Sequence, residues 1–443
     1  MSRKPLHTNF LLVLFKLSLT AGIALLSACG GGSSAGAPRA TVNTTPAPLD
    51  DALAILKNAS STIIDVLAND GFGLNLPSTT AVTISTPASN GTATVNLNGT
   101  ADDPTDDTVS YIPDADYHGT DNFQYTIADA DGETAAATVF ITIIQNLIDI
   151  KDAIFSATSG DCTTYDNAYE AAVTDIKRSV NFDMDVVITA EATSCSLDSN
   201  SIPNHDFNDM TASFAEDAAE INRSFTITRN PTFSATTTVL SQSVYNAVML
   251  NGVVLDLLSA GCYKPSSTDP LPDPDGNVPI GCDASAVPWL LDPLFAGNTF
   301  GTDIHNAHVQ PDGTYHYHGN PIAMFDDSPD VNGSPVIGFA ADGFPVYGAY
   351  FDDGGTVRKA LSSYDLIGAP ALTARPAQDA TNPGGNYDGT YVQDYVYTAN
   401  SGDLDECNGM TVNGQYAYYV TDAYPWVMSC FKGLPDNSFN KTP

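Results

Sequence analysis

Between residues 50 and 144, β-branched and apolar residues form short runs that alternate with polar positions or turn-forming clusters. The clearest runs are residues 62–66, 81–84, 93–96 and 138–142. Gly, Asn, Asp and Pro separate them at short intervals, as in antiparallel strands packed into a β-sandwich. We therefore predict an all-β domain over residues 49–146.

After this segment, longer polar stretches separate the apolar runs. Residues 167–178 predict a short helix, because several apolar residues fall on one side of it. These residues are Tyr169, Ala172, Val173 and Ile176. Strand-like runs follow at residues 185–189, 224–228, 244–250 and 253–257. The last two flank Asn251 and Gly252, a favoured hairpin turn. We predict that residues 150–443 form a β-rich domain with long loops, so the fold class is mainly β.

The N-terminal residues have the order of a secretory signal. Arg3 and Lys4 precede an apolar run that Lys16 interrupts and that ends at Ala28, just before Cys29. This order predicts a signal peptide over residues 1–28. An uncleaved membrane helix is the alternative, but the run is short, contains a lysine and leads into Gly and Ser residues.

Residues 26–29, Leu-Ser-Ala-Cys, resemble the lipobox of bacterial lipoproteins. The resemblance implies a diacylated Cys29 thiol, which would hold the protein stably in a membrane. It places the chain in the cell envelope, outside the cytoplasm. Gly30 and Gly31 resemble the type sorted to the outer membrane, if the source has two membranes. The Gly-, Ser- and Pro-rich residues 29–48 predict a flexible tether.

The composition is strongly acidic. Without Arg3, Lys4 and Lys16 of the signal, 13 Lys+Arg stand against 52 Asp+Glu, a formal net charge of −39. This charge excludes nucleic acid and anionic lipid as partners of the folded body. Its simplest role is a well-solvated surface.

Six cysteines remain once Cys29 is assigned to the lipid. They are Cys162, Cys195, Cys262, Cys282, Cys407 and Cys430. An even number in an exported chain predicts three disulfides, whose pairing the sequence leaves open. We favour pairing of neighbours along the chain, since each pair encloses one local loop.

Residues 65–70, 111–121 and 123–132 resemble the cadherin-like, bacterial Ig-type repeats of large surface proteins. Such modules act as spacers or adhesive arms. Two acidic turns in this segment could supply oxygen ligands to Ca²⁺. They are Asp114 with Asp116 and Asp129 with Asp131. The alternative is that these aspartates form Asx-turns without a metal. We expect His118 in this domain to be structural.

Four histidines of this histidine-poor chain fall within fourteen residues: His305, His308, His316 and His318. On a strand, His316 and His318 share one face, whereas Tyr315 and Tyr317 occupy the other and could support the site. The turn signal at residues 311–313 lets His308 fold back beside them. Three such imidazoles suit Zn²⁺ or Cu²⁺, with Asp303 or His305 as a further ligand. The alternative is that the imidazoles only make hydrogen bonds in a polar core.

The segment from His308 to His318 resembles the motif of the YHYH family, which is named for this tetrapeptide. Three further segments agree in order, namely residues 199–207, 338–348, and 404–409 with 424–433. The resemblance spans about residues 185–435 and implies an extracellular domain with a metal-binding motif, but no established activity. Relatives repeat a Tyr-His motif near the end, where this chain has Tyr418 and Tyr419 without histidine.

Other residues have more than one interpretation. His205, in the opening motif, could be a fourth ligand or a local hydrogen-bonding residue. Asp342 could accept a hydrogen bond from a ligating imidazole, or it could be an ordinary turn residue. Asp405 and Glu406 could be an acid–base pair, or part of a solvated face.

Three functions remain open. The protein could sequester a metal through four protein ligands, or use three histidines and an open position for hydrolysis or oxidation. It could instead be a non-catalytic module that binds glycans or another surface protein. No phosphate loop or metallopeptidase motif is present in the sequence.

Overall fold

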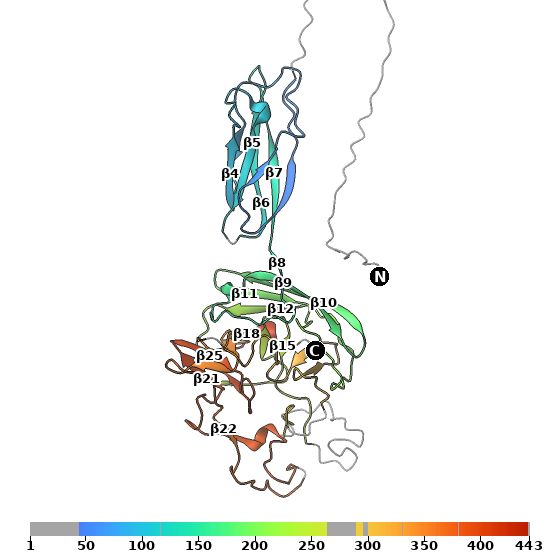
Figure 1. Cartoon of the computed structure of the whole chain (residues 1–443), viewed down its shortest axis with the longest axis vertical. Helices are drawn as coiled ribbons and strands as arrows, with labels where there is room; N and C mark the ends of the chain where they lie inside the picture. Colours follow the sequence, from blue (N-terminus) through green and yellow to red (C-terminus); the bar gives the residue numbers. More distant parts are fainter. Residues whose placement is uncertain are drawn as a thin grey trace, which may run out of the picture.

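The computed structural model describes residues 44–115, 117–263, 289–295, 300–329, 331–379 and 381–441. Within them the chain is mainly β, as predicted, with four short 3₁₀ segments. Figure 1 shows a slender N-terminal domain that stands on a wider second domain. No helix among these residues is long and apolar enough to span a bilayer. The predicted signal and Cys29 lie outside the described residues.

The N-terminal domain is a two-sheet sandwich. One sheet has the order β1 (Asp51–Leu56), β7 (Thr134–Ile144), β6 (Gly119–Ala128), β3 (Thr83–Thr86). The other has the order β2 (Thr62–Ile64), β5 (Thr108–Pro113), β4 (Gly91–Asn96), and η1 is Pro104–Asp106. Side chains of β6 and β7 alternate between buried and exposed, which places their apolar faces in one core. The alternation in the sequence thus predicted this sandwich correctly.

The predicted tether ends within this domain. Residues 44–48 are described, and Ala47 exchanges backbone hydrogen bonds with Gly71 of 2.7 and 3.3 Å. The last few residues of the 29–48 segment therefore pack on the sandwich.

The second domain contains two main sheets around one core. The five-stranded sheet has the order β12 (Arg223–Thr228), β11 (Ser194–Ser199), β10 (Val180–Ala190), β9 (Asn167–Asp175), β8 (Leu147–Asp149). The eight-stranded sheet has the order β16 (Ala307–Val309), β17 (Tyr315–Tyr317), β15 (Val254–Leu255), β14 (Ala247–Met249), β18 (Val336–Ala340), β19 (Pro345–Tyr347), β25 (Gln415–Tyr419), β24 (Gly409–Val412). Apolar side chains from both sheets form one continuous cluster.

Three two-stranded ladders and three 3₁₀ segments complete this domain. The ladders are β13 (Thr238–Val239) with β26 (Cys430–Phe431), β20 (Tyr350–Asp352) with β21 (Val357–Lys359), and β22 (Tyr364–Leu366) with β23 (Tyr395–Tyr397). The 3₁₀ segments are η2 (Cys162–Tyr165), η3 (Val392–Asp394) and η4 (Asn437–Phe439).

One predicted element is wrong. Residues 167–178 do not form a helix, because Asn167–Asp175 is strand β9, paired antiparallel with β10. Tyr169 and Val173 suit either period, but the buried positions alternate along β9, and Ile176 is exposed. The long strand β10 offers backbone hydrogen bonds to these residues only if they are extended. Pairing with β10 therefore overrides the helical spacing of apolar residues in the sequence.

The hairpin prediction is confirmed, since β14 and β15 pair antiparallel around Asn251 and Gly252. Gly252 has φ +79°, and a Cβ there would lie 2.2 Å from the Ser199 Oγ, so only glycine fits.

The two domains are joined by a short, partly buried contact. The chain passes from β7 into β8, which pairs parallel with β9 of the second domain. Asp166 receives a hydrogen bond of 2.9 Å from Gln145 Nε2 and an ion pair of 3.3 Å from Lys57. The Lys57 side chain is buried in this contact, which fixes the end of the sandwich against the second domain.

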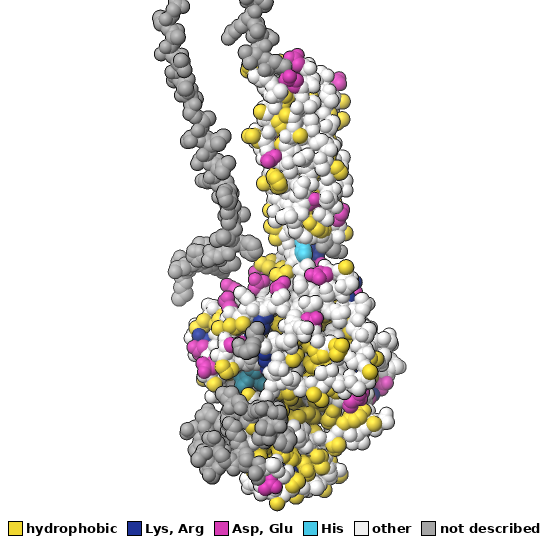
Figure 2. Space-filling view, turned by 180° about the vertical axis from the view of Figure 1, so that it is seen from behind, with side chains coloured by type: hydrophobic (Ala, Val, Ile, Leu, Met, Phe, Trp, Pro, Cys, Tyr) yellow, Lys and Arg dark blue, Asp and Glu magenta, His cyan; other side chains and the backbone are white. Residues whose placement is uncertain are grey.

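The described residues contain the two disulfides Cys162–Cys195 and Cys407–Cys430. Both match the predicted pairing of neighbours. The third predicted pair includes Cys282, which lies outside the described residues. Disulfides fit a protein outside the cytoplasm. Figure 2 shows acidic side chains spread over both domains with few basic ones between them, consistent with the net charge of −36 for the whole chain.

Candidate metal centre

The candidate site is built on the hairpin of β16 and β17, at the edge of the eight-stranded sheet. Gly313 turns the chain with φ +93°, and its N–H donates to the Gln310 carbonyl at 2.9 Å. This turn, which the sequence predicted, sets His308 opposite His316 in the antiparallel register. His318 follows two residues after His316, and their alternation brings all three imidazoles to one face.

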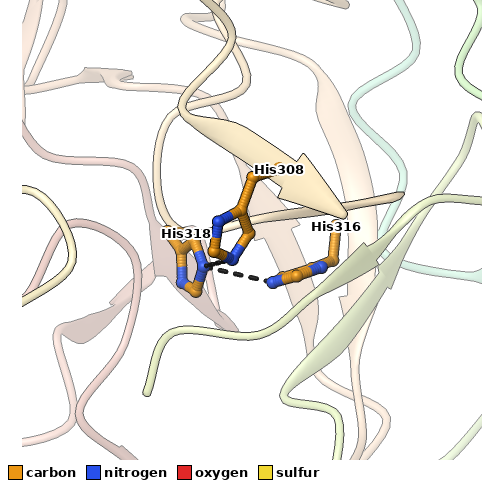
Figure 3. Close-up of side chains that lie close together, drawn as sticks. All are labelled: His308, His316 and His318. Atoms are coloured by element: carbon orange, nitrogen blue, oxygen red, sulfur yellow. Dashed lines mark hydrogen bonds between the residues drawn. The ribbon is translucent and has the colours of Figure 1, made fainter. Parts of the chain in front are cut away.

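The three ring nitrogens converge. His318 Nε2 lies 3.0 Å from His308 Nε2 and 3.1 Å from His316 Nε2. Figure 3 shows dashed lines from one nitrogen of His318 to nitrogens of His308 and His316, which are turned toward it. We call His308, His316 and His318 the histidine triad. It is the one group of three or more potential metal ligands among the described residues.

The backbone fixes the protonation of two members of the triad. His308 Nδ1 lies 2.8 Å from the Phe300 carbonyl, and His316 Nδ1 lies 3.2 Å from the Thr314 carbonyl. A carbonyl only accepts, so each Nδ1 carries the proton and donates it. In the neutral ring, the Nε2 atom then has only its lone pair, which it directs at the centre of the triad.

Burial keeps these rings neutral. It lowers the pKa of His308 and holds the pKa of His316 and of His318 well below the usual value, because a charged ring would lose its hydration. Mutual repulsion of the rings acts in the same direction. A neutral His318 has one proton to offer, so the converging lone pairs are not all matched by donors. A cation would match them.

The spacing fits a transition metal. Two imidazole ligands at 2.0–2.1 Å from one Zn²⁺ ion lie about 3.3 Å apart in tetrahedral geometry. The two distances from His318 Nε2, 3.0 and 3.1 Å, are close to this value, and all three ligand atoms lie within 4.8 Å of one another. Uncharged imidazole is a preferred ligand of Zn²⁺ and Cu²⁺. The residues present therefore fit such an ion, with three protein ligands.

The triad faces a cavity of about 390 Å³. Its walls include the three imidazoles and the polar side chains of Asp256, Gln310 and Lys441. A ligand in this cavity could approach an ion held by the triad from the side that no described protein ligand occupies.

Comparison with known protein families agrees with the position of this site. Residues 224–433 match the family model described as YHYH protein, and residues 43–142 match the one described as Bacterial Ig domain. The chain carries a YHYH domain. The order of the two domains is the one that the sequence predicted. No curated protein and no solved structure matches the chain.

The other two histidines of the second domain, His205 and His305, lie on the opposite face of the hairpin from the triad. The rings of His205 and His305 stack with centroids 3.6 Å apart. His205 Nε2 lies 2.7 Å from the Tyr317 hydroxyl, and Tyr315 donates to Asp303 at 2.8 Å. The expected fourth ligand, His205, His305 or Asp303, is thus not brought to the triad. The two tyrosines instead fix the opposite face of β17.

Asp342 does not contact the imidazoles of the triad through any described hydrogen bond. Its Oδ2 accepts from the Tyr418 hydroxyl at 2.7 Å and from the Gly433 N–H at 2.9 Å. Asp342 thus supports the packing of β25. Asp405 and Glu406 form ion pairs with Lys432 at 2.9 and 2.7 Å, and these three residues line a cavity separate from that of the triad.

The acidic turns of the Ig-like domain give no cluster of three ligands within the described residues. Asp129 Oδ1 accepts the N–H groups of Asp131 and Glu133 at 3.1 and 2.9 Å, the geometry of an Asx-turn. Asp116 lies outside the described residues.

Sequence reasoning missed Asp256, Gln310 and Lys441, which line the cavity, and Phe300, whose carbonyl orients His308. Gln310 was detectable, because it lies next to the turn of the hairpin. Asp256 and Lys441 were not, because they reach the cavity through long-range pairing.

Proposed function

We propose that the YHYH domain binds one Zn²⁺ or Cu²⁺ ion through the Nε2 atoms of His308, His316 and His318. The observation that supports this most directly is the convergence of three buried, neutral imidazoles, two of which donate their Nδ1 protons to backbone carbonyls. The Asp256 backbone interacts with the His318 ring and opposes the lowering of its pKa, so the ring has a hydrogen-bond partner apart from the triad. The proposal assigns no role as ligand to His205 or His305.

The cavity supports an ion with an open coordination position. Sequestration would call for a fourth protein ligand, and the described residues supply three. Of the alternatives, a metal-dependent hydrolase or oxidase therefore has a specific observation in its favour. A Zn²⁺ ion would supply an activated water, and a Cu²⁺ ion an electron acceptor. The protein would contribute the buried imidazoles and the polar walls of the cavity.

We also propose that the domain acts outside the cytoplasm, anchored by a lipid on Cys29. The sequence of the first thirty residues and the disulfides of the second domain support this location. The Ig-like domain would then be an arm between the membrane and the metal site, and it could also contact a surface protein or a glycan.

The test is metal loading of protein purified without a histidine tag. The protein is stripped with a chelator, offered Zn²⁺ or Cu²⁺ separately, freed of excess by gel filtration and analysed for metal. We expect about one equivalent of one of these ions. Less than about a tenth of an equivalent of both would overturn the proposal.

A further inference from the structure

Asp256 lies beside the histidine triad because of the strand register. β15 pairs parallel with β17, which sets Val254 opposite His316 and Leu255 opposite Tyr317. The Asp256 N–H then donates to the Tyr317 carbonyl at 2.9 Å, which continues the ladder. Because side chains alternate along a strand, Asp256 is on the same face as Val254, the face of His316 and His318.

Only one of the two oxygens of the Asp256 carboxylate has a hydrogen-bond partner among the described residues. Its Oδ2 accepts from Gln310 Nε2 at 2.6 Å and from the Lys441 ammonium group. Its Oδ1 is buried and has no hydrogen-bond partner among the described residues. Buried carboxylate oxygens are nearly always hydrogen-bonded, so we expect a further hydrogen-bond donor to bind Oδ1.

The position of Asp256 restricts what that partner can be. Asp256 and the three imidazoles line the same cavity, so the carboxylate lies next to the space that a ligand of the triad would occupy. Lys441 neutralises the carboxylate, and its own place is fixed by a 2.8 Å hydrogen bond from its N–H to the Ser243 carbonyl. The partner must donate, since a carboxylate only accepts.

We propose that Asp256 accepts a hydrogen bond from the molecule that completes the coordination of the triad-bound ion. That molecule is a small protic ligand with an O–H or N–H group, of which water is the simplest. This inference rests on the proposed function, because it needs an ion in the triad. Asp256 is then a positioning residue that selects a donor and disfavours an anion in the open position.

Azide binding to the copper-loaded protein tests the proposal, because azide is an anion without a proton to donate. Wild type, Asp256→Asn and Asp342→Asn are loaded with Cu²⁺, analysed for metal and titrated with azide by absorption. Asp342 is the matched control, a buried aspartate with an unpaired Oδ1 that does not line this cavity. We expect full copper loading of all three proteins and roughly tenfold tighter azide binding in Asp256→Asn alone. In this variant, an amide N–H that can donate a hydrogen bond to azide replaces a carboxylate that repels it.

The double variant Asp256→Asn/Lys441→Met separates the effect of the hydrogen bond on azide binding from the effect of charge. It also provides a second test if the single variant folds poorly because the Lys441 charge has lost its partner. It removes the pair of opposite charges together, so a persisting gain in azide affinity comes from the exchange of an acceptor for a donor. Unchanged azide affinity in both Asp256 variants with full copper would overturn the inference alone. Loss of copper from them, but not from Asp342→Asn, would make Asp256 a ligand and overturn it too. Absence of copper from the wild type would overturn the proposed function as well.

Discussion

The two faces of strand β17 each hold histidines, but with opposite arrangements. On one face, the triad directs three Nε2 atoms at a common point, 3.0 and 3.1 Å apart. On the other, His205 and His305 stack, and their ring nitrogens have separate partners. His205 uses the Tyr317 hydroxyl and the Asp206 carbonyl as partners, and His305 Nδ1 lies 2.8 Å from the Pro321 carbonyl.

The difference teaches that clustering of histidines is not enough for a metal site. In the stacked pair, neighbouring groups already pair with both nitrogens of His205 and with Nδ1 of His305. In the triad, the Phe300 and Thr314 carbonyls accept the Nδ1 protons of His308 and His316, so the Nε2 lone pairs of these two rings point at the centre of the triad. The direction of the lone pairs, set by the hydrogen bonds on the far side of each ring, decides between a structural and a ligating role.

The largest expected effect separates the two faces directly. His316→Ala/His318→Ala removes two of three ligands, so we expect metal binding to weaken by at least about a hundredfold. His205→Asn and His118→Ala should stay within about threefold of the wild type. Competition with a chromophoric chelator measures the affinities. Equal losses in the double variant and in His205→Asn would contradict the distinction between the faces.

Metal should also stabilise only a protein with the intact triad. At a free Zn²⁺ concentration a thousandfold above Kd, binding adds about 4 kcal/mol to the free energy of unfolding. Urea unfolding with and without the metal measures this gain. Stabilisation of the same size in His316→Ala/His318→Ala would place the ion elsewhere, for instance on the acidic surface.

On the tyrosine face, we expect a loss of stability without a loss of metal. Tyr317→Phe removes the hydroxyl that pairs with His205 and accepts from Asn251 at 3.0 Å. Buried polar partners left unpaired cost about 1–3 kcal/mol. Unfolding of the metal-free protein should show this decrease, whereas the bound metal should stay at one equivalent. A variant of wild-type stability that binds no metal would assign Tyr317 to the site itself.

The smallest effect concerns pH. Burial lowers the pKa of His205 to about 3, so between this value and the ordinary 6.5 the unfolded chain binds a proton that the folded protein does not. The free energy of unfolding therefore falls as pH falls below about 6.5, by up to about 1.4 kcal/mol per pH unit from this residue. Metal-free His205→Asn should show a shallower decrease between pH 7 and 5.5 than the wild type. Parallel decreases would show that His205 is not buried as a neutral ring.

The sequence predicts the parts of this molecule that depend on local pattern. Alternation of buried positions gives the sandwich, and the turn at Gly313 with the spacing of His316 and His318 gives the triad. Prediction from the sequence fails where the secondary structure depends on pairing with strands distant in the chain. Tyr169 and Val173 suit a helix or a strand equally, and only β10 settles the matter.

The same limit applies to the site. Asp256 reaches the cavity because a two-residue strand, β15, pairs with β17 some sixty residues later in the chain. Lys441, which also lines the cavity, is 185 residues from Asp256 in the sequence. His205 belongs to a loop that leads to the tyrosine face, so its place in the opening motif gave no information about the side on which it lies.

Anomalous diffraction from crystals of the metal-loaded protein tests the central claim most directly. Data recorded at the absorption edge of the bound ion, Zn²⁺ or Cu²⁺, should show one peak, at about 2.0–2.1 Å from the Nε2 atoms of His308, His316 and His318. No peak should lie beside His205 or His305. A fully occupied ion at any other position, with the triad nitrogens still 3.0–3.1 Å apart and unbound, would contradict the account.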